Sequence, residues 1–186
     1  IKLPLPPSCL QTLWNAKQRY IDSYLQNYPG YYETGDAGYV DDDGYLYVMS
    51  RTDDVINTAG HRLSTGAIEE VISNHQDVAE CAVLGVYDEL KGQIPIGLAC
   101  LNAGCNRKHN EISKEIIELV RKDIGPVASF KYVGLVKALP KTRSGKILRS
   151  TIRKIVDGKN WEMPATVEDP QVFENIIEVV KNLKIS

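Results

Sequence analysis

The spacing of apolar residues changes after residue 53, and the change predicts two regions of different architecture. In the first region, Ala16, Tyr20, Tyr24 and Tyr28 recur at every fourth position, which predicts a short helix that ends before Pro29-Gly30. Two runs rich in Tyr and Val then flank the turn residues 41–44 (DDDG), a pattern typical of a β-hairpin. The first region is therefore expected to hold one helix and one hairpin.

Beyond residue 53, strand-like and helix-like stretches alternate. Helical spacing is found at residues 64–75, 110–124 and 147–156, and a tail helix is expected to begin at Asp169-Pro170. Strand-like stretches are 78–88, 92–102 and 131–139, and the stretch VINTAGHRL at 55–63 is expected to hold a loop between short apolar pieces. This alternation predicts an α/β (α+β) fold, a small domain in which helices pack on a short sheet.

Composition narrows the possible partners. The chain of 186 residues has a formal net charge of −2, so it has no overall field that favours nucleic acid or an anionic membrane. No apolar run approaches the ~18 residues needed to cross a membrane. The four cysteines form no C-x-x-C pair, which argues against a metal site, and Cys81 and Cys100 lie in apolar runs that predict buried thiols. Because the chain begins with Ile1 rather than Met, we expect it to be a fragment.

Two polar motifs each allow two interpretations. In Thr34-Gly35-Asp36, the Asp36 carboxylate either accepts hydrogen bonds from a vicinal diol such as ribose or closes a turn on its own backbone. Arg51 and Arg62 bracket a polar loop that contains Gly60. They either recognise an anion, with close backbone approach at Gly60, or are solvated arginines of a surface connector.

The third motif is LPKTRSGKILR at residues 139–149, in which Lys146 follows Ser144-Gly145. It is not a Walker phosphate loop, because that pattern needs a glycine where Pro140 stands and a Ser or Thr where Ile147 stands. A nucleic-acid patch would need interleaved aromatic residues and a basic domain. Two interpretations remain open: a solvated basic turn, and a catalytic lysine that a moving loop delivers.

The three motifs occur in order as TGD, then R-x-D-D-x-I-x-x-x-G-x-R, then P-K-T-x-S-G-K. This combination resembles the C-terminal part of the AMP-forming acyl-CoA synthetases, of the adenylate-forming superfamily, over nearly the whole chain. The segments LPPSCLQTLW, GHRLSTGAIEEVI and RKDIGP look most like the short-chain branch, the acetyl- and propionyl-CoA synthetases. One departure is Ser8, where that branch would have glycine, in a connector.

The resemblance implies an acid-thiol ligase that converts a short carboxylic acid (acetate or propionate), ATP and CoA into acyl-CoA through an acyl-adenylate, with Mg bound outside this chain. Residues 1–52 would end a large N-terminal adenylation domain, and residues 53–186 would form a small mobile domain with Asp53 as the hinge. The partners would be these small molecules and the chain's own N-terminal domain, with no nucleic acid and no membrane. The location would be the mitochondrial matrix or the cytoplasm.

The resemblance also assigns roles to single residues. Lys146 would be the catalytic residue of adenylation; Asp36, Arg51 and Arg62 would bind ATP or AMP; Gly60 and Ala59 would line the pantetheine tunnel; and Arg121 would bind the CoA phosphates. The fragment alone is expected to be inactive. Two alternatives stay open: another adenylate-forming ligase, such as an adenylation domain that acylates a carrier protein, and a non-catalytic binding or regulatory module.

Overall fold

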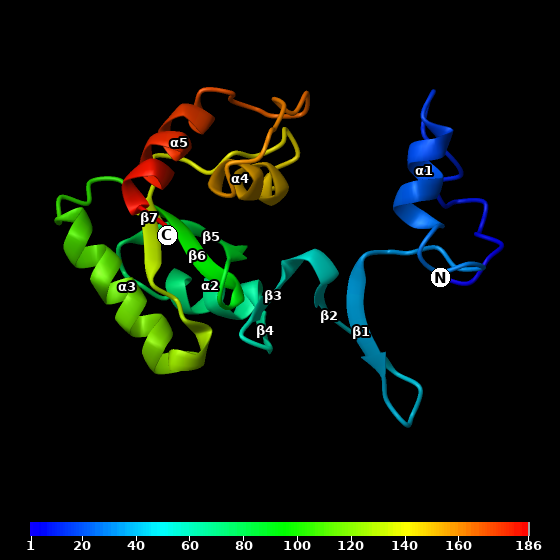
Figure 1. The fold of residues 1–186 in the computed structure, drawn as a ribbon, viewed down its shortest axis with the longest axis horizontal. Helices are drawn as coiled ribbons and strands as arrows, with labels where there is room; N and C mark the ends of the chain where they lie inside the picture. Colours follow the sequence, from blue (N-terminus) through cyan, green and yellow to red (C-terminus); the bar gives the residue numbers. More distant parts are fainter. Residues whose placement is uncertain (186) are drawn as a thin grey trace. The chain divides into compact units, whose positions relative to one another are not determined.

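The computed structural model describes residues 1–185, with the side chains of all of these except Met49, Ser50 and Asp53. The chain divides into two compact units, Ile1–Asp53 and Asp54–Ser186. Figure 1 shows each unit with its own elements. The division falls one residue after the boundary that the sequence predicts.

The first unit contains helix α1 (Lys17–Tyr24) and the hairpin of β1 (Asp36–Val40) and β2 (Leu46–Arg51). The hairpin is the predicted one, and Asp41 Oδ1 closes its turn by accepting from the Tyr45 amide at 2.8 Å. The predicted helix end at Tyr28 is wrong. The helix stops at Tyr24 because the returning chain takes over its last carbonyl: the Glu33 amide donates to the Tyr24 oxygen at 2.8 Å.

The second unit is built on a sheet whose central strand is β6 (Gly92–Leu101). β5 (Val78–Asp88) runs antiparallel along one edge of β6. The other edge is shared by β3 (Val55–Thr58), which pairs at Gly92, and by β7 (Tyr132–Leu135), which runs parallel to residues 96–99. β4 (His61–Ser64) pairs with β3 and completes the sheet.

The stretch 55–63 is a hairpin, in which the predicted loop is the two-residue turn and the short apolar pieces beside it are the paired strands β3 and β4. Thr58 pairs with His61, and the turn residues between them, Ala59 and Gly60, have φ of 49° and 84°. Positive φ at both central positions is the geometry of a type I′ turn, whose twist matches that of the strands it joins. The glycine makes this turn possible despite strands of only four residues.

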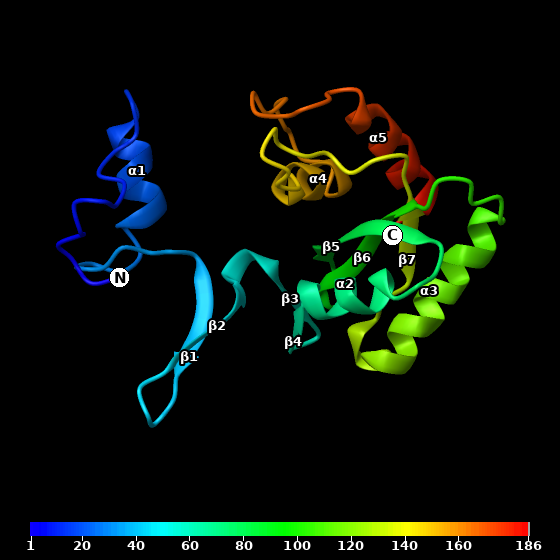
Figure 2. The same cartoon turned by 180° about the vertical axis from the view of Figure 1, so that it is seen from behind.

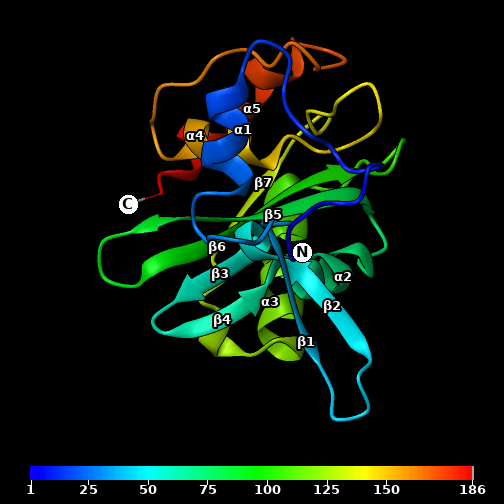
Figure 3. The ribbon, with the colours of Figure 1, turned by 90° about the vertical axis from the view of Figure 1, so that its right-hand side faces the viewer.

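Helices cover both faces of the sheet (Figures 1, 2 and 3). Helices α2 (Thr65–Ser73) and α3 (His109–Asp123) pack on one face, where Ile72, Ile116 and Val83 belong to one apolar cluster. Helices α4 (Arg149–Val156) and α5 (Val172–Leu183) pack on the other, where Ile152 and Ile176 join Leu84 and Ile96 of the strands. Double coverage explains why β5 and β6 are continuous apolar runs rather than alternating ones. The predicted α/β fold, a sheet packed by helices, is confirmed.

Helix starts follow local capping. Ser64 Oγ accepts from the Ala67 amide at 3.3 Å and caps α2. The tail helix begins three residues later than Asp169, because the Asp169 carboxylate accepts from the Gln171 amide at 2.9 Å and forms a separate turn first. Short 3-10 turns lie at Thr52–Asp54 and Pro126–Ala128.

All four cysteines are free, and Cys81 and Cys100 are buried as predicted. Burial raises the pKa of the Cys81 thiol and raises that of Cys100 to about 12, so both stay protonated at neutral pH. Within residues 1–185, every helix is too short or too polar to cross a membrane.

Candidate functional site

Lys146 closes a tight hairpin between β7 and α4. The Thr142 amide donates to the Lys146 carbonyl at 2.8 Å, and the Gly145 amide donates to the Thr142 carbonyl at 2.8 Å. One step further out, Lys141 and Ile147 form a bridge pair. Gly145 has φ of 83°, a value that L side chains rarely adopt, which explains why a glycine precedes the lysine.

The side chains of Lys146 and Arg143 are exposed, whereas the two cations further out on the hairpin, Lys141 and Arg149, are paired. Lys141 forms an ion pair with Glu80, and Arg149 Nη2 lies 2.7 Å from Glu69 Oε1. Among the side chains that the structure describes, none gives the Lys146 ammonium a hydrogen bond or an ion pair. The hairpin therefore presents two exposed cations, Lys146 and Arg143, to an anion from outside the unit, and Lys146 is the one that directly follows the glycine.

Asp36 and Arg51 lie opposite each other on β1 and β2 of the first unit. Arg51 Nη1 is 3.6 Å from Asp36 Oδ1 and donates to the Thr34 carbonyl at 3.0 Å. A Cβ at Gly35 would lie 2.9 Å from Arg51 Nη2, so the glycine of the TGD motif leaves room for the guanidinium. The Asp36 carboxylate is 40% exposed and lines a hollow of about 430 Å³, so it is oriented by Arg51 and open to further donors.

The β3–β4 turn carries Ala59 and Gly60, and Arg62 follows on β4. The Ala59 amide donates to the Lys91 carbonyl at 2.9 Å, which fixes the turn against the β5–β6 connection. A Cβ at Gly60 would meet no atom within 4 Å. The turn therefore presents bare backbone at its outer side, and the exposed Arg62 side chain lies next to it.

Arg121 lies near the end of α3 and lines a pocket of about 260 Å³. The Lys91 ammonium donates to Ser129 Oγ at 2.9 Å, and Ser129 lines the same pocket as Arg121. Because Lys91 also holds Ala59, the turn and the pocket belong to one end of the second unit. Sequence reasoning missed Lys91, Ser129 and Lys131, the other polar residues here, because none of them belongs to a motif.

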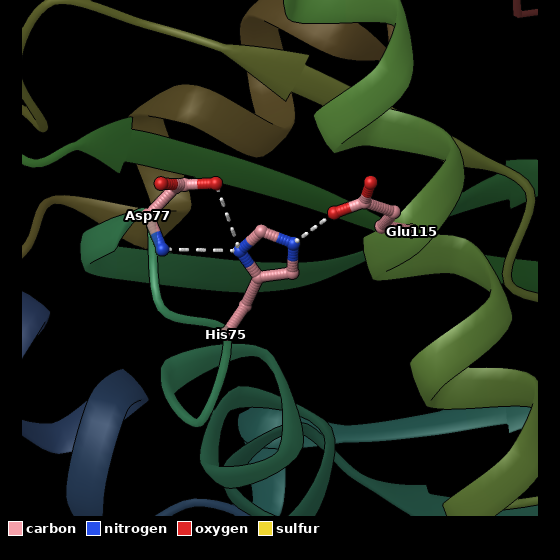
Figure 4. A group of neighbouring side chains, drawn as sticks. All are labelled: His75, Asp77 and Glu115. Atoms are coloured by element: carbon pink, nitrogen blue, oxygen red, sulfur yellow. Dashed lines mark hydrogen bonds and ion pairs between the residues drawn. The ribbon is translucent and has the colours of Figure 1, made fainter. Parts of the chain in front are cut away.

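A group of potential metal ligands lies between α2 and α3 (Figure 4). His75 Nδ1 accepts from the Asp77 amide at 3.2 Å, so the neutral ring donates from Nε2 to Glu115 at 3.0 Å. Arg107 also donates to Asp77 at 2.8 Å and to both oxygens of Glu115.

These bonds, those of Arg107 first, lower the pKa of Glu115 to about 2. The guanidinium of Arg107 already fills the position of the cation, and Mg²⁺ prefers oxygen ligands with room for water. Among the described residues this is the one such group of three, and it fits a structural ion-pair cluster rather than a magnesium site.

Comparison with known proteins identifies the second unit. Residues 67–146 match the family model described as AMP-binding enzyme C-terminal domain. The chain is 56% identical over 176 residues to an uncharacterized protein of Pseudomonas aeruginosa, covering 95% of this chain and 28% of that protein. It is 51% identical over 181 residues to the mitochondrial acyl-CoA synthetase short-chain family member 3 of Mus musculus, covering 97% of this chain and 26% of that protein. It is also 46% identical over 180 residues to the acetyl-coenzyme A synthetase of Penicillium chrysogenum, covering 96% of this chain and 27% of that protein.

Solved structures agree with these relatives. The amide bond synthetase McbA from Marinactinospora thermotolerans matches with a TM-score of 0.59 and 26% identity, over 77% of this chain and 28% of that one. ATP-bound MatB from Rhodopseudomonas palustris matches in fold with a TM-score of 0.63 and 21% identity, over 79% of this chain and 28% of that one. The chain spans about a quarter of the length of these proteins. Residues 67–146 thus belong to the C-terminal domain family of the AMP-binding enzymes, and the chain as a whole is homologous to the C-terminal part of short-chain acyl-CoA synthetases.

Proposed function

We propose that the chain supplies the C-terminal part of an AMP-forming, short-chain acyl-CoA synthetase. In the first half-reaction an oxygen of acetate or propionate attacks the α-phosphorus of ATP and pyrophosphate leaves. In the second, the CoA thiol attacks the acyl carbon and AMP leaves. The relatives at about 50% identity over nearly the whole chain support this proposal.

Lys146 is the adenylation residue in this proposal, and its exposed, unpaired ammonium is the observation that carries it. Negative charge accumulates on the oxygens of the α-phosphate while the carboxylate attacks. A cation placed there, in a site that excludes water, stabilises the transition state more than the ground state. Lysine suits this role because its charge is compact and its stem is long.

Asp36, Arg51 and Arg62 would bind the nucleotide. A partly exposed carboxylate already oriented by Arg51 is suited to accept hydrogen bonds from the two ribose hydroxyls. Arg62, exposed on β4, would contact a phosphate of the nucleotide.

Ala59, Gly60 and Arg121 would bind CoA in the second half-reaction. Bare backbone at Gly60 leaves room for a narrow pantetheine arm to pass, and the guanidinium of Arg121 is suited to the CoA phosphates. Lys91 contacts both the turn and the Arg121 pocket, so the two lie at the same end of the second unit. This proximity supports the assignment.

We further propose that residues 1–52 end a large N-terminal domain and that residues 53–186 form the mobile one. The backbone of Asp53, the proposed hinge, lies in the 3-10 turn Thr52–Asp54, next to the division between the two units, and its side chain lies outside the described residues. Magnesium would bind with ATP outside this chain, because the His75 cluster does not fit it. The mitochondrial relatives support a mitochondrial matrix location, with the cytoplasm as the alternative.

The test uses the full-length enzyme and measures the half-reactions separately. Lys146→Ala should reduce carboxylate-dependent exchange of pyrophosphate into ATP by roughly 100- to 1,000-fold, the usual loss for one transition-state donor. It should leave thioester formation from supplied acyl-adenylate intact. Lys114→Ala, at an exposed lysine of α3, is the control and should change neither rate. Unchanged pyrophosphate exchange in Lys146→Ala would disprove the assignment.

A further inference from the structure

Two carboxylates of the second unit hold the hairpin that carries Lys146. On its first arm, Lys141 pairs with Glu80 of β5, and each side chain is one-third exposed. Glu80 is also the main reason that the pKa of Lys141 is raised. The pair joins residues 61 positions apart, so it anchors the hairpin to the sheet rather than to a neighbour in sequence.

The second anchor lies just after the hairpin, at the start of α4. Arg149 Nη2 donates to both oxygens of Glu69 on α2, at 2.7 and 2.9 Å. Glu69 Oε1 also accepts from the Val83 amide of β5 at 2.8 Å. Because a backbone amide fixes this carboxylate, Arg149 is held against the sheet rather than against a freely rotating side chain.

The segment 166–168 supports the hairpin from the side. The Glu168 amide donates to the Lys141 carbonyl at 2.9 Å, and the Arg143 amide donates to the Thr166 carbonyl at 3.2 Å. Thr142 and Val167 form a bridge pair. The backbone of the hairpin is thus tied on both sides, and only its tip projects.

We propose that Glu69 and Glu80 are positioning residues for adenylation, which clamp the Lys146 hairpin so that its ammonium reaches the reacting phosphate as part of the moving unit. This inference rests on the proposed function. A hairpin that is already fixed loses no further conformational entropy when the lysine reaches the phosphate. A loose hairpin would sample many positions from which the ammonium does not reach it. A displacement of 1 Å from the reacting group can reduce a rate by about 100-fold.

The clamp predicts a loss confined to one half-reaction. In the full-length enzyme, Glu69→Gln and Glu80→Gln should each lower kcat of pyrophosphate exchange by about 10- to 100-fold and leave the KM values for ATP and carboxylate nearly unchanged. Thioester formation from supplied acyl-adenylate should not change. Glu70→Gln, at the exposed position next to Glu69, is the matched control and should behave like the parent.

A double-mutant cycle distinguishes the loss of the Glu80–Lys141 ion pair from a general disturbance of the fold. If Glu80 acts through Lys141, then Lys141→Gln should reduce adenylation as much as Glu80→Gln, and the double variant should lose no more than either single one. Lys141→Arg should retain the rate. Additive losses, or equal losses in both half-reactions, would overturn the positioning role and leave a structural one.

Lys146→Ala is measured in parallel to separate the two proposals. If Lys146→Ala abolishes adenylation and the two glutamate variants keep the parental rate, the clamp is wrong and the proposed function stands. If Lys146→Ala retains adenylation, the proposed role of Lys146 fails, and the clamp fails with it because it acts through that lysine. A selective loss in all three variants supports both.

Discussion

The hairpin of Lys146 and the turn between β3 and β4 each contain a glycine of positive φ, but they present different groups to solvent. Each is closed by a glycine of positive φ, 83° at Gly145 and 84° at Gly60, and a Cβ at either position would meet no atom within 4 Å. In the first, the next residue is an unpaired cation, Lys146. In the second, the outer side is bare backbone. The tip of one turn presents a cation, and the tip of the other presents open space with Arg62 beside it on β4, which suits the two proposed half-reactions.

The two hairpins are attached to opposite ends of the β5–β6 pair. Ala59 contacts Lys91, which precedes the start of β6 at Gly92. Lys141 contacts Glu80, whose cross-strand partner is Cys100 near the other end of β6. Cys100 lies eight residue steps along β6 from Gly92, about 26 Å at roughly 3.3 Å per step. Attachment points so far apart favour the proposal that the unit turns between two positions and offers one end at a time.

Within this comparison of the two hairpins, the largest effect should come from placing leucine at the two glycines in the full-length enzyme. Gly60→Leu should reduce thioester formation by about 100-fold, because the side chain fills the proposed tunnel, and should leave pyrophosphate exchange intact. Gly145→Leu should do the opposite, because it distorts the lysine hairpin. Each half-reaction is measured separately, the second with supplied acyl-adenylate.

Gly158→Leu is the control for backbone strain. Gly158 has φ of 63° and, like the other two glycines, no neighbour within 4 Å of a built Cβ. The three substitutions therefore carry a similar conformational cost, about 1–2 kcal/mol. If Gly158→Leu impairs either half-reaction as much as its counterparts do, strain rather than position explains the losses and the comparison of the two hairpins fails.

A smaller effect is expected at the CoA end. Arg121→Ala should raise the KM for CoA about tenfold, since a hydrogen bond to a charged group contributes about 1.5 kcal/mol or more. Pyrophosphate exchange should not change. Lys122→Ala removes a neighbouring exposed cation that does not line the Arg121 pocket, so it should leave the KM for CoA unchanged. Equal effects of the two variants would indicate general electrostatic attraction and not a site at Arg121.

The elements that sequence predicts best are those that packing determines. β5 and β6 are long apolar runs between turn residues, and their burial on both faces leaves few alternatives. The β3–β4 hairpin was missed because its strands have four residues and its turn reads Ala-Gly, although Ala59 adopts a φ that alanine rarely takes. There the pairing with Gly92 of β6 overrides local preference.

The residues of the candidate site also differ in whether the sequence predicts them. Lys146, Asp36 and Arg51 stand in short motifs whose spacing is visible in the sequence. Glu69 and Glu80 could not be predicted, because they meet Arg149 and Lys141 across 80 and 61 residues. A glutamate within an apolar strand, as Glu80 is, indicates a polar partner but does not say which one.

The smallest expected effect is on the stability of the second unit, at the ion-pair cluster of Glu115. Glu115 joins α3 to His75 and Arg107, and its pKa of about 2 lies below its ordinary value of 4.5. A carboxyl group with a lowered pKa stabilises the fold above its unfolded-state pKa, and this contribution is lost as the pH falls through the folded-state pKa.

Glu115→Gln should therefore lower the free energy of unfolding of the chain at pH 7, and the difference from the parent should shrink between about pH 4.5 and pH 2. Urea unfolding at a series of pH values measures this difference. Glu118→Gln, at an exposed residue of the same helix, is the control and should change stability little at any pH. In the full-length enzyme, Glu115→Gln should leave the ratio of the two half-reaction rates unchanged, because the bonds of the cluster join α3 to residues 75, 77 and 107 rather than to either hairpin. A difference that persists unchanged at pH 2 would show that the charge of Glu115 is not its source.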